Sequence, residues 1–512
     1  MIVINFNKPE FEYDVHSMVK AYLPKEDVEM YYTCPLEEVE GKNVACTHRE
    51  IEHEDEETRK RLEEAEYIFY VDYLENKISI KWIIGGDKLF TRDFEVDFFD
   101  RKETKNALKQ NLYDLLKEGT GRELPWGTLT GIRPTKIPMK LMEEGKSDEE
   151  IFQYMKETYF ATDEKIQLSI DIAKRERKLL EKIDYENGYS LYIGIPFCPT
   201  TCLYCSFTSY PLSRFGHQTG AYVEALKKEI EASAKLLADK RLATVYFGGG
   251  TPTALSAEEL RDVIRTVKKY FPTEQIAEWT VEAGRPDTIT TEKLQMLYDE
   301  GISRISINPQ TMNQKTLDVI GRMHTTEDIC RAYEEARHIG FDNINMDLII
   351  GLTGENAEDV EATLRSIGAL SPDSVTVHTL ALKRAARLNI EKEQYEDKGA
   401  VQVSDMLTAS VKFAKENGYA PYYLYRQKNM EENLENVGYA RPGKEGLYNI
   451  LIMEEKHSIL ALGAGGATKL VLQGGERIER SENVKSLKDY LERTDEMIAR
   501  KYAFFEQYKG LY

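Results

Sequence analysis

The chain has 512 residues, 41% of them hydrophobic, and a formal net charge of −20 from 88 acidic and 68 basic residues. This length exceeds what one hydrophobic core usually serves, so we expect two or three domains. The acidic excess disfavours nucleic acid as a partner. The sequence has no apolar run of about eighteen residues and its first residues lack the features of a signal peptide, so we expect no membrane span and a cytoplasmic location.

The first 120 residues are predicted to form an α+β domain. Three segments rich in aromatic and β-branched residues are separated by turn residues, at 67–73, 77–84 and 90–98. A helix is expected from about residue 102 to 118, ended by Gly119 and Gly121. These elements predict a three-stranded meander covered by one helix. Residues 121–188 are interpreted as a helical linker region.

Between residues 189 and 388, strand-like and helical patterns alternate strictly. Six short β-rich runs are separated by helical patterns of ten or more residues, and the runs lie at 191–195, 244–247, 279–282, 304–307, 343–349 and 374–378. This alternation is typical of an α/β fold with a parallel sheet, either open and doubly wound or closed into an incomplete barrel. The remaining residues, 389–512, are predicted to form a mainly helical C-terminal extension.

Unusual polar residues lie at or just beyond the carboxyl ends of these predicted strands. They are the glycine run 248–250, Glu282, Gln310, Asp347 and His378. Parallel α/β folds build their sites at that edge of the sheet, so we expect these residues to share one site. Two alternatives stay open: a tight glycine turn without a ligand, and a salt bridge from Glu282 to Arg285 or Arg304.

Cys198, Cys202 and Cys205 form a Cys-x3-Cys-x2-Cys triplet directly after the first of these strands. Three thiolates on one short loop can hold three irons of a [4Fe–4S] cube and leave the fourth iron open to another ligand. A zinc site is a weaker alternative, because the nearest histidine, His217, has no paired partner. Three buried, inert thiols are another. A chain with six cysteines rarely shows this spacing by chance, which favours the cluster.

Several motifs together resemble the radical S-adenosylmethionine (SAM) superfamily, in its oxygen-independent coproporphyrinogen III oxidase branch, and most closely the HemZ-type proteins. They are Tyr-x-Gly-Ile-Pro-Phe-Cys at 192–198, the cysteine triplet, Gly-Gly-Gly-Thr-Pro-Thr at 248–253 and Asp-Leu-Ile-Ile-Gly-Leu at 347–352. The resemblance covers residues 190 to 470 approximately. It implies an incomplete (β/α)6 radical SAM barrel between residues 189 and 388.

The resemblance also implies cofactors and their ligands. Cys198, Cys202 and Cys205 would hold a [4Fe–4S] cluster, and SAM would chelate the open iron. Residues expected to contact that SAM by position are Tyr192, Gly249 and Glu282. Members with a second SAM site place there the residues that correspond to Tyr204, Gly250, Thr251, Gln310, Arg322, Asp347 and Ala381.

The activity implied is the oxidative decarboxylation of coproporphyrinogen III to protoporphyrinogen IX without oxygen. The partners implied are a tetrapyrrole substrate and an electron donor such as flavodoxin or ferredoxin, and the oligomeric state is left open. Residues 389–512 would close over the substrate. Basic side chains that could pair with its carboxylates are Arg384, Arg387, Arg426, Lys428 and Arg441.

Two positions depart from the best-defined oxidases of the branch. Phe207 stands where they have a fourth cysteine, and Gly194 stands where they have a histidine. Related haem chaperones of the HemW type also lack the fourth cysteine, but they carry a His-Asn-x-x-Tyr-Trp segment. Its nearest counterpart here, at 448–453, is Tyr-Asn-Ile-Leu-Ile-Met. A haem chaperone and a radical enzyme acting on another tetrapyrrole are therefore the alternative hypotheses.

Overall fold

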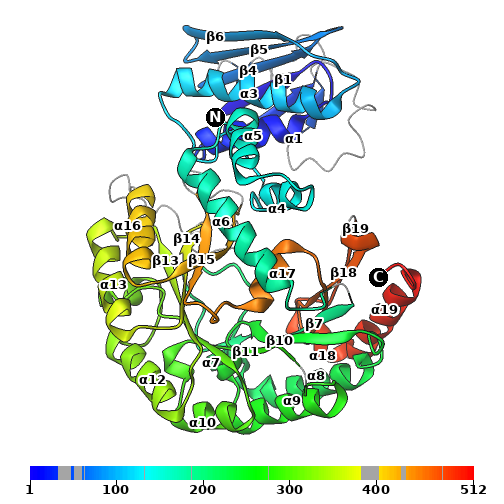
Figure 1. The fold of residues 1–512 in the computed structure, drawn as a ribbon, viewed down its shortest axis with the longest axis vertical. Coiled ribbons are helices and arrows are strands. Elements are labelled where there is room, and N and C mark those ends of the chain that lie inside the picture. Colours follow the sequence, from blue (N-terminus) through cyan, green and yellow to red (C-terminus); the bar gives the residue numbers. More distant parts are fainter. Residues whose placement is uncertain are drawn as a thin grey trace. The chain divides into compact units, whose positions relative to one another are not determined.

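The computed structural model describes residues 1–32, 48–50, 60–62, 64–131, 133–185, 187–274, 276–381, 403–427, 434–475 and 477–512. These residues belong to two compact units (Figure 1). The first unit comprises Met1–Ile170 and Arg426–Leu434, and the second comprises Asp171–Tyr425 and Glu435–Tyr512. The four-part domain division expected above stays a prediction. Within the described ranges, no helix combines the length and the apolar character that a membrane crossing requires.

The first unit is built on a six-stranded mixed sheet. Its strand order is β3-β2-β1-β4-β5-β6, where β1 is Ile2–Phe6, β2 Val28–Tyr32, β3 His48–Glu50, β4 Tyr67–Tyr73, β5 Lys77–Ile84 and β6 Lys88–Glu95. Strands β4, β5 and β6 are the predicted meander, which is confirmed. Strand β1 pairs in parallel with both β2 and β4, so the sheet extends beyond the part that was predicted.

Two helices, α1 (Glu12–Tyr22) and α3 (Arg101–Thr120), pack on the core of this sheet. Alternation places Ile78, Ile80 and Trp82 of β5 on the buried face. Helix α3 does not end at Gly119, as predicted, but continues to Thr120 with Gly121 as its left-handed cap. Gly119 instead makes room for a neighbour, because a Cβ atom there would overlap the ring of Trp82. Three further helices follow: α4 (Lys136–Glu143), α5 (Asp148–Tyr159) and α6 (Asp163–Leu180).

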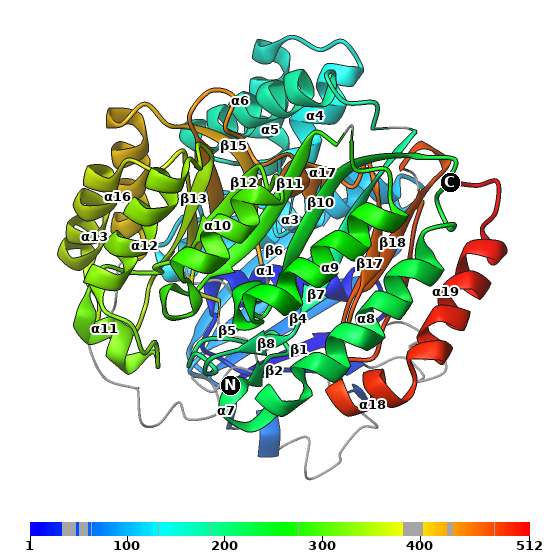
Figure 2. The same ribbon diagram turned by 90° about the horizontal axis from the view of Figure 1, so that it is seen from below.

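The second unit contains the predicted alternation of strands and helices. Six parallel neighbours form the middle of its sheet in chain order: β7 (Gly188–Ile195), β10 (Arg241–Gly249), β11 (Glu278–Gly284), β12 (Arg304–Ile307), β13 (Ile344–Ile350) and β14 (Ser374–Thr379). Their helices cover the outer face of the curved sheet (Figure 2), and they are α8 (Thr219–Ser233), α9 (Ala257–Tyr270), α10 (Thr291–Asp299), α12 (Thr326–Ile339) and α13 (Ala357–Leu370). The incomplete (β/α)6 barrel is confirmed.

The C-terminal extension is helical in α16 (Val403–Glu416), α17 (Leu447–Glu454), α18 (Leu487–Glu492) and α19 (Thr494–Gln507). It also supplies strands that the sequence did not predict, which lengthen the sheet at both edges. Beyond β14 lie β16 (Asn436–Ala440) and β15 (Ala420–Tyr425), and beyond β7 lie β17 (Ser458–Leu462), β18 (Ala467–Leu472) and β19 (Arg477–Glu482). The described part of this sheet therefore has 11 strands.

Candidate functional site

The cysteine loop follows β7 and is held at its base by a short parallel ladder between β8 (Phe197–Cys198) and β9 (Tyr210–Pro211). Cys198 and Cys202 are buried and Cys205 is partly buried, and all three are free thiols. The backbone N–H of Leu203 donates to the carbonyl of Ile320 at 3.0 Å, which ties the loop to the segment after β12. Burial raises the pKa of the Cys198 thiol to about 11. Iron binding would therefore have to displace a proton from this thiol.

The glycine run after β10 packs directly against the cysteine loop. The N–H of Gly250 donates to the carbonyl of Ile195 at 2.8 Å, and the N–H of Thr251 donates to the carbonyl of Phe197 at 2.8 Å. A Cβ atom on Gly250 would lie 2.6 Å from the carbonyl oxygen of Phe197 and 3.0 Å from Cys198 Sγ. Gly250 is thus required by close approach of the two segments. Thr251 Oγ1 also hydrogen-bonds Cys198 Sγ at 3.5 Å.

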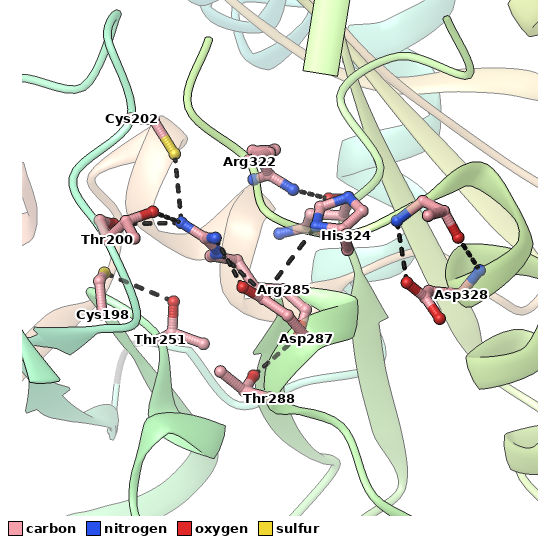
Figure 3. Close-up of polar contacts among 12 residues, drawn as sticks. Cys198, Thr200, Cys202, Thr251, Arg285, Asp287, Thr288, Arg322, His324 and Asp328 are labelled. Atoms are coloured by element: carbon pink, nitrogen blue, oxygen red, sulfur yellow. Dashed lines mark hydrogen bonds and ion pairs between the residues drawn. The ribbon is translucent and has the colours of Figure 1, made fainter. Parts of the chain in front are cut away.

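Arg285, directly after β11, is the main side-chain support of the cysteine loop (Figure 3). Its Nη1 donates to the carbonyl oxygen of Thr200 at 3.1 Å, to Thr200 Oγ1 at 2.7 Å and to Cys202 Sγ at 3.7 Å. The same guanidinium forms a two-point ion pair with Asp287. Sequence reasoning treated Arg285 only as a possible partner of Glu282, because nothing in its local pattern points to a contact 85 residues earlier.

Glu282, on β11, does not form either salt bridge considered above. Its Oε1 accepts a short hydrogen bond from the phenol of Tyr246, while Arg285 pairs with Asp287. Arg304 is engaged elsewhere, since its guanidinium donates to Asn343 Oδ1 at 2.7 Å and Ser374 Oγ at 2.9 Å. Burial raises the pKa of Glu282 to about 7, and the charge of Asp347 acts in the same direction. A carboxylate without a cation is available to accept from a polar ligand.

Three tyrosine rings stack beside Glu282. The three ring centroids form a triangle, with 6.2 Å between Tyr192 and Tyr246, 4.3 Å between Tyr246 and Tyr448, and 6.4 Å between Tyr192 and Tyr448. Tyr192 comes from β7, Tyr246 from β10 and Tyr448 from α17. Tyr192 was expected at the site. No role there was predicted for Tyr448, which belongs to the segment that differs from the haem chaperones. The stack joins the C-terminal extension to the interior of the parallel sheet.

Asp347, on β13, belongs to a group of polar side chains that also come from β14 and β15. Asn345 Nδ2 donates to its Oδ1 at 2.7 Å, and His378 Nε2 lies 3.8 Å from its Oδ2. Burial acts to raise the pKa of Asp347, but His378 and the hydrogen bonds hold it below its ordinary value. His378 Nδ1 is 3.1 Å from the phenol of Tyr425 on β15. Asp347 is therefore held as a carboxylate.

Gln310 and Arg322 are buried and carry polar atoms without partners in the described part of the chain. Gln310 Oε1 and Arg322 Nε make no hydrogen bond, although the two residues are only 8% and 5% exposed. Gln310 also has a left-handed backbone with φ of 68° and forms a bridge to Leu348. Buried polar groups normally have partners, so these two atoms fit residues that bind a polar ligand.

Tyr204 connects Arg322 to the cysteine loop. Burial acts to lower the pKa of Arg322, but the Tyr204 phenol and the Cys202 thiol hold it above its ordinary value. Nη1 of Arg322 donates to the carbonyl of Asn308 at 2.5 Å. Ala381 lies two residues beyond the end of β14, next to Leu380, whose N–H donates to the carbonyl of Ile350 at 3.0 Å. The structure thus gathers the cysteine triplet, Gly250, Thr251, Tyr204 and Arg322 around one loop. Tyr192, Glu282 and Asp347 lie on three strands of the same parallel sheet, β7, β11 and β13.

Two of the basic residues considered for substrate carboxylates are described, and each has partners within its own unit. Arg426 belongs to the first unit and donates to the carbonyl of Leu129 at 2.7 Å. Arg441 donates to Ser371 Oγ at 2.8 Å, just before β14 and so at the amino end of the sheet. Each guanidinium thus has a partner within the protein, and its pairing with a substrate carboxylate stays a prediction. Arg384, Arg387 and Lys428 lie outside the described residues.

The donor set fits an iron–sulfur cluster better than a single ion. Among the described residues, no three or more histidine, cysteine, aspartate or glutamate side chains are placed to hold one metal ion. Three thiols that each bind a different iron of a cube do not have to converge on one point. The approach of Cys198 Sγ to Gly250, and the unpartnered atoms of Gln310 and Arg322, are compatible with a cluster and a polar organic ligand beside it.

Fold and cysteine loop together define the class of protein. Residues 192–367 match the family described as the radical SAM superfamily. Members of this superfamily use a [4Fe–4S] cluster and S-adenosylmethionine, which is the pair of cofactors expected from the motifs. A solved structure, coproporphyrinogen III oxidase (HemN) from Escherichia coli, described as a radical SAM enzyme, superposes with a TM-score of 0.51 at 25% identity, over 63% of this chain and 73% of that one.

Curated relatives narrow this class further. The chain is 42% identical to the "oxygen-independent coproporphyrinogen-III oxidase-like protein HemZ" of Bacillus subtilis, over 83% of this chain and 86% of the relative. It is 34% identical to the "heme chaperone HemW" of the same organism, over 38% of this chain and 51% of that protein. The chain belongs to the HemZ-like family of the radical SAM superfamily.

Proposed function

We propose that this protein catalyses the oxygen-independent oxidative decarboxylation of coproporphyrinogen III to protoporphyrinogen IX. Two findings on the same chain together support this proposal. Three polar residues expected for the oxidase branch come from consecutive strands of one parallel sheet: Glu282 lies on β11, Gln310 follows β12, and Asp347 lies on β13. The same chain is similar over 83% of its length to a coproporphyrinogen-III oxidase-like protein.

The chain's own residues would divide the work of cofactor binding. Cys198, Cys202 and Cys205 would hold the cluster, and cluster and SAM together supply one-electron chemistry that removes a hydrogen atom from carbon. The Glu282 carboxylate would accept hydrogen bonds from ribose hydroxyls. Gly249, with φ of 111°, would let a ligand approach the backbone. Gln310 Oε1 and Arg322 Nε would find partners on a second polar ligand.

The proposed reaction changes two propionate side chains into vinyl groups. Each propionate loses one hydrogen atom from its β-carbon, its carboxylate as carbon dioxide, and one further electron. That electron has to pass to a one-electron acceptor, and a separate donor, such as flavodoxin or ferredoxin, has to reduce the cluster before each turnover. The residues around the site would orient the propionate and exclude water from the reacting carbon.

A haem chaperone is the second candidate function, because a HemW protein is also similar to this chain. The Cys-x3-Cys-x2-Cys loop is compatible with either activity. Phe207, at the position of the fourth cysteine in the best-defined oxidases, is 70% exposed. The Tyr448 segment differs from the histidine-containing segment expected of a haem chaperone, and Tyr448 packs against Tyr246. This packing favours a role in the cofactor site over haem transfer.

An anaerobic assay would test the proposal directly. The reconstituted protein is incubated with reductant, SAM and coproporphyrinogen III, and the products are separated by chromatography. We expect protoporphyrin after oxidation, together with 5′-deoxyadenosine, and neither product from Cys202→Ala. Cys330→Ala is the matched control, because Cys330 is a free thiol on α12, away from the cysteine loop. Deoxyadenosine without a vinyl product would reject the substrate, and stoichiometric haem binding without turnover would favour the chaperone.

A further inference from the structure

We propose that Arg285 is a positioning residue for the cysteine loop and that its charge raises the reduction potential of the cluster bound there. This inference rests on the cluster that members of the superfamily use, and it does not depend on the tetrapyrrole substrate. Arg285 contributes three hydrogen bonds to the loop and a guanidinium 3.7 Å from the sulfur of a ligand cysteine.

The contacts of Arg285 make it a clamp on the part of the loop between two ligand cysteines. Thr200 lies between Cys198 and Cys202, and both its carbonyl and its hydroxyl oxygen accept from Arg285. The Thr200 hydroxyl in turn donates to the carbonyl of Gly321 at 2.9 Å. The loop is therefore joined through Thr200 to Arg285, directly after β11, and to Gly321, in the turn that follows helix α11 (Gln314–Val319). This arrangement limits how far Cys198 and Cys202 can move apart.

Asp287 fixes the clamp from the other side. Its two carboxylate oxygens accept from Nε and Nη2 of Arg285 at 3.0 Å and 2.7 Å, so Nη1 is left to point at the loop (Figure 3). Arg285 is only 2% exposed, so water cannot screen its charge effectively. The planar two-point geometry is particular to arginine, and lysine cannot reproduce it.

A buried cation beside a cysteine ligand has a predictable effect on a cluster. Reduction adds one negative charge, and both a nearby positive charge and an N–H bond to sulfur stabilise the reduced form. Arg285 supplies both to Cys202. Asp287 partly offsets the positive charge. The two residues should therefore shift the potential in opposite directions, although both belong to the same ion pair.

The other charged groups around this pair do not reverse the expected shift in reduction potential. Arg322 is also close to Cys202, and its positive charge acts in the same direction as that of Arg285. His324 Nδ1 lies 3.9 Å from Asp287 Oδ1. Burial and the charge of Arg322 lower the pKa of His324 to about 4, so this imidazole is neutral at pH 7. Asp287 is thus the anion that faces Arg285 directly.

Redox titration of the reconstituted full-length chain, without SAM or substrate and followed by electron paramagnetic resonance, tests the inference. We expect Arg285→Gln to lower the equilibrium constant for reduction at least tenfold, which for one electron is about 59 mV. Asp287→Asn should move the potential in the opposite direction. Arg285→Lys keeps the charge and loses the two-point geometry, so its potential should lie between those of the wild type and Arg285→Gln.

Arg304→Gln is the matched control, because Arg304 is equally buried but bonds Asn343 and Ser374 instead of a cysteine. Its potential should equal that of the wild type. Potentials of Arg285→Gln and Asp287→Asn that shift in the same direction, or not at all, would overturn the inference. If Arg285→Gln holds no cluster, the direction of the Asp287→Asn shift decides. A wild-type chain without a cluster would refute the cofactor assignment itself, whereas a cluster without decarboxylation would reject only the substrate.

Discussion

Two buried ion pairs support the site, and they do so in different ways. Arg285 and Asp287 are two residues apart, and Arg285 touches the cysteine loop directly. Glu229 on α8 and Lys501 on α19 are 272 residues apart, and their contact of 2.7 Å is almost completely buried. Glu229 Oε2 accepts from the N–H of Gly463 at 2.8 Å, so this second pair holds the glycine loop after β17.

The glycine loop after β17 connects the Glu229–Lys501 pair to the segment before the cysteine loop. The phenol of Tyr222 accepts from the N–H of Ala464 at 3.0 Å and donates to the carbonyl of Gly194 at 2.6 Å, four residues before Cys198. The Glu229–Lys501 pair therefore reaches the segment before Cys198 through the backbone of the glycine loop and the phenol of Tyr222. Tyr490, which donates to Glu229, also packs on the Tyr222 ring. An ion pair beside a ligand thiol can change the reduction potential of a bound cluster. An ion pair farther from the thiols can only position the backbone. The predictions below test this distinction.

Loss of Lys501 should have the largest effect on stability. Lys501→Met leaves Glu229 buried with its remaining hydrogen bonds but without its cation, which typically costs about 3–5 kcal/mol. We expect this loss in the free energy of unfolding, measured by urea denaturation. The reduction potential of any cluster that remains should stay within experimental error of the wild type. A shift comparable with that of Arg285→Gln would contradict the distinction between the two pairs.

A double variant provides the control for this prediction. Glu229→Gln together with Lys501→Met removes both charges, so no uncompensated charge stays buried. It should be more stable than Lys501→Met alone. If the double variant is the less stable of the two, then the hydrogen bonds of Glu229 to Gly463, Tyr490 and Asn483 matter more than its charge.

Glu282 is a half-buried carboxylate that pairs with no lysine, arginine or histidine among the described residues, so it allows the same comparison for an unpaired charge. Its pKa is raised from 4.5 to about 7, mainly by burial. Between these pH values the folded protein keeps a proton that the unfolded chain has released, so stability falls as the pH rises through this window. Glu282→Gln should therefore be more stable than the wild type at pH 8, by at most about 3 kcal/mol, and the difference should vanish near pH 4.

Denaturation series at pH 4, 6 and 8 would measure this difference, and SAM binding would be measured alongside. We expect Glu282→Gln to bind SAM more weakly even where it is the more stable protein. A stability difference that is the same at every pH would show that Glu282 is not protonated in the folded state. Tyr246→Phe is the matched variant, because it removes the hydrogen bond to Glu282 but keeps the ring stack.

The six parallel strands could be predicted because each is a short apolar run between two amphipathic helices. The run 304–307 coincides with β12, and the other five differ from the observed strands by a few residues at their ends. Strand β17 was not predicted, because it pairs with β7 more than 260 residues away and no local turn sequence indicates that pairing. The same holds for β1, whose neighbours β2 and β4 lie on both sides of it.

The site shows the same division between local and distant signals. Cysteine spacing is a local pattern, so the triplet could be identified from the sequence alone. The contact of Arg285 with Thr200 and the left-handed backbone of Gln310 depend on tertiary packing and could not. The salt bridge considered for Glu282 was wrong for a related reason: Arg285 is near in sequence, but it turns to Asp287 and the loop.

Gly463→Ala should have a smaller effect than the charge variants. Its φ of 97° disfavours a side chain, and a Cβ atom there would overlap the carbonyl of Gly194 and lie 2.6 Å from the phenol of Tyr222. Gly465→Ala is the matched control, because φ is 72° there but the nearest neighbour, on Lys485, is 3.6 Å away. We expect Gly463→Ala to cost about 2 kcal/mol more than the control in urea denaturation. Equal costs would mean that the glycine loop yields without moving the segment before Cys198.

Thr251→Val should have the smallest effect on the reduction potential. It removes a hydrogen bond to sulfur without changing any charge. Thr251 Oγ1 lies 3.5 Å from Cys198 Sγ, in a contact without net charge. A neutral hydrogen bond contributes about 0.5–1.5 kcal/mol. Only the part of this energy that differs between the oxidised and the reduced cluster shifts the potential, so the equilibrium constant for cluster reduction should change by less than tenfold. The redox titration proposed for Arg285 measures it. A shift as large as that of Arg285→Gln would mean that hydrogen bonding, and not the buried cation, sets the potential, because Thr251→Val leaves every charge around the loop in place.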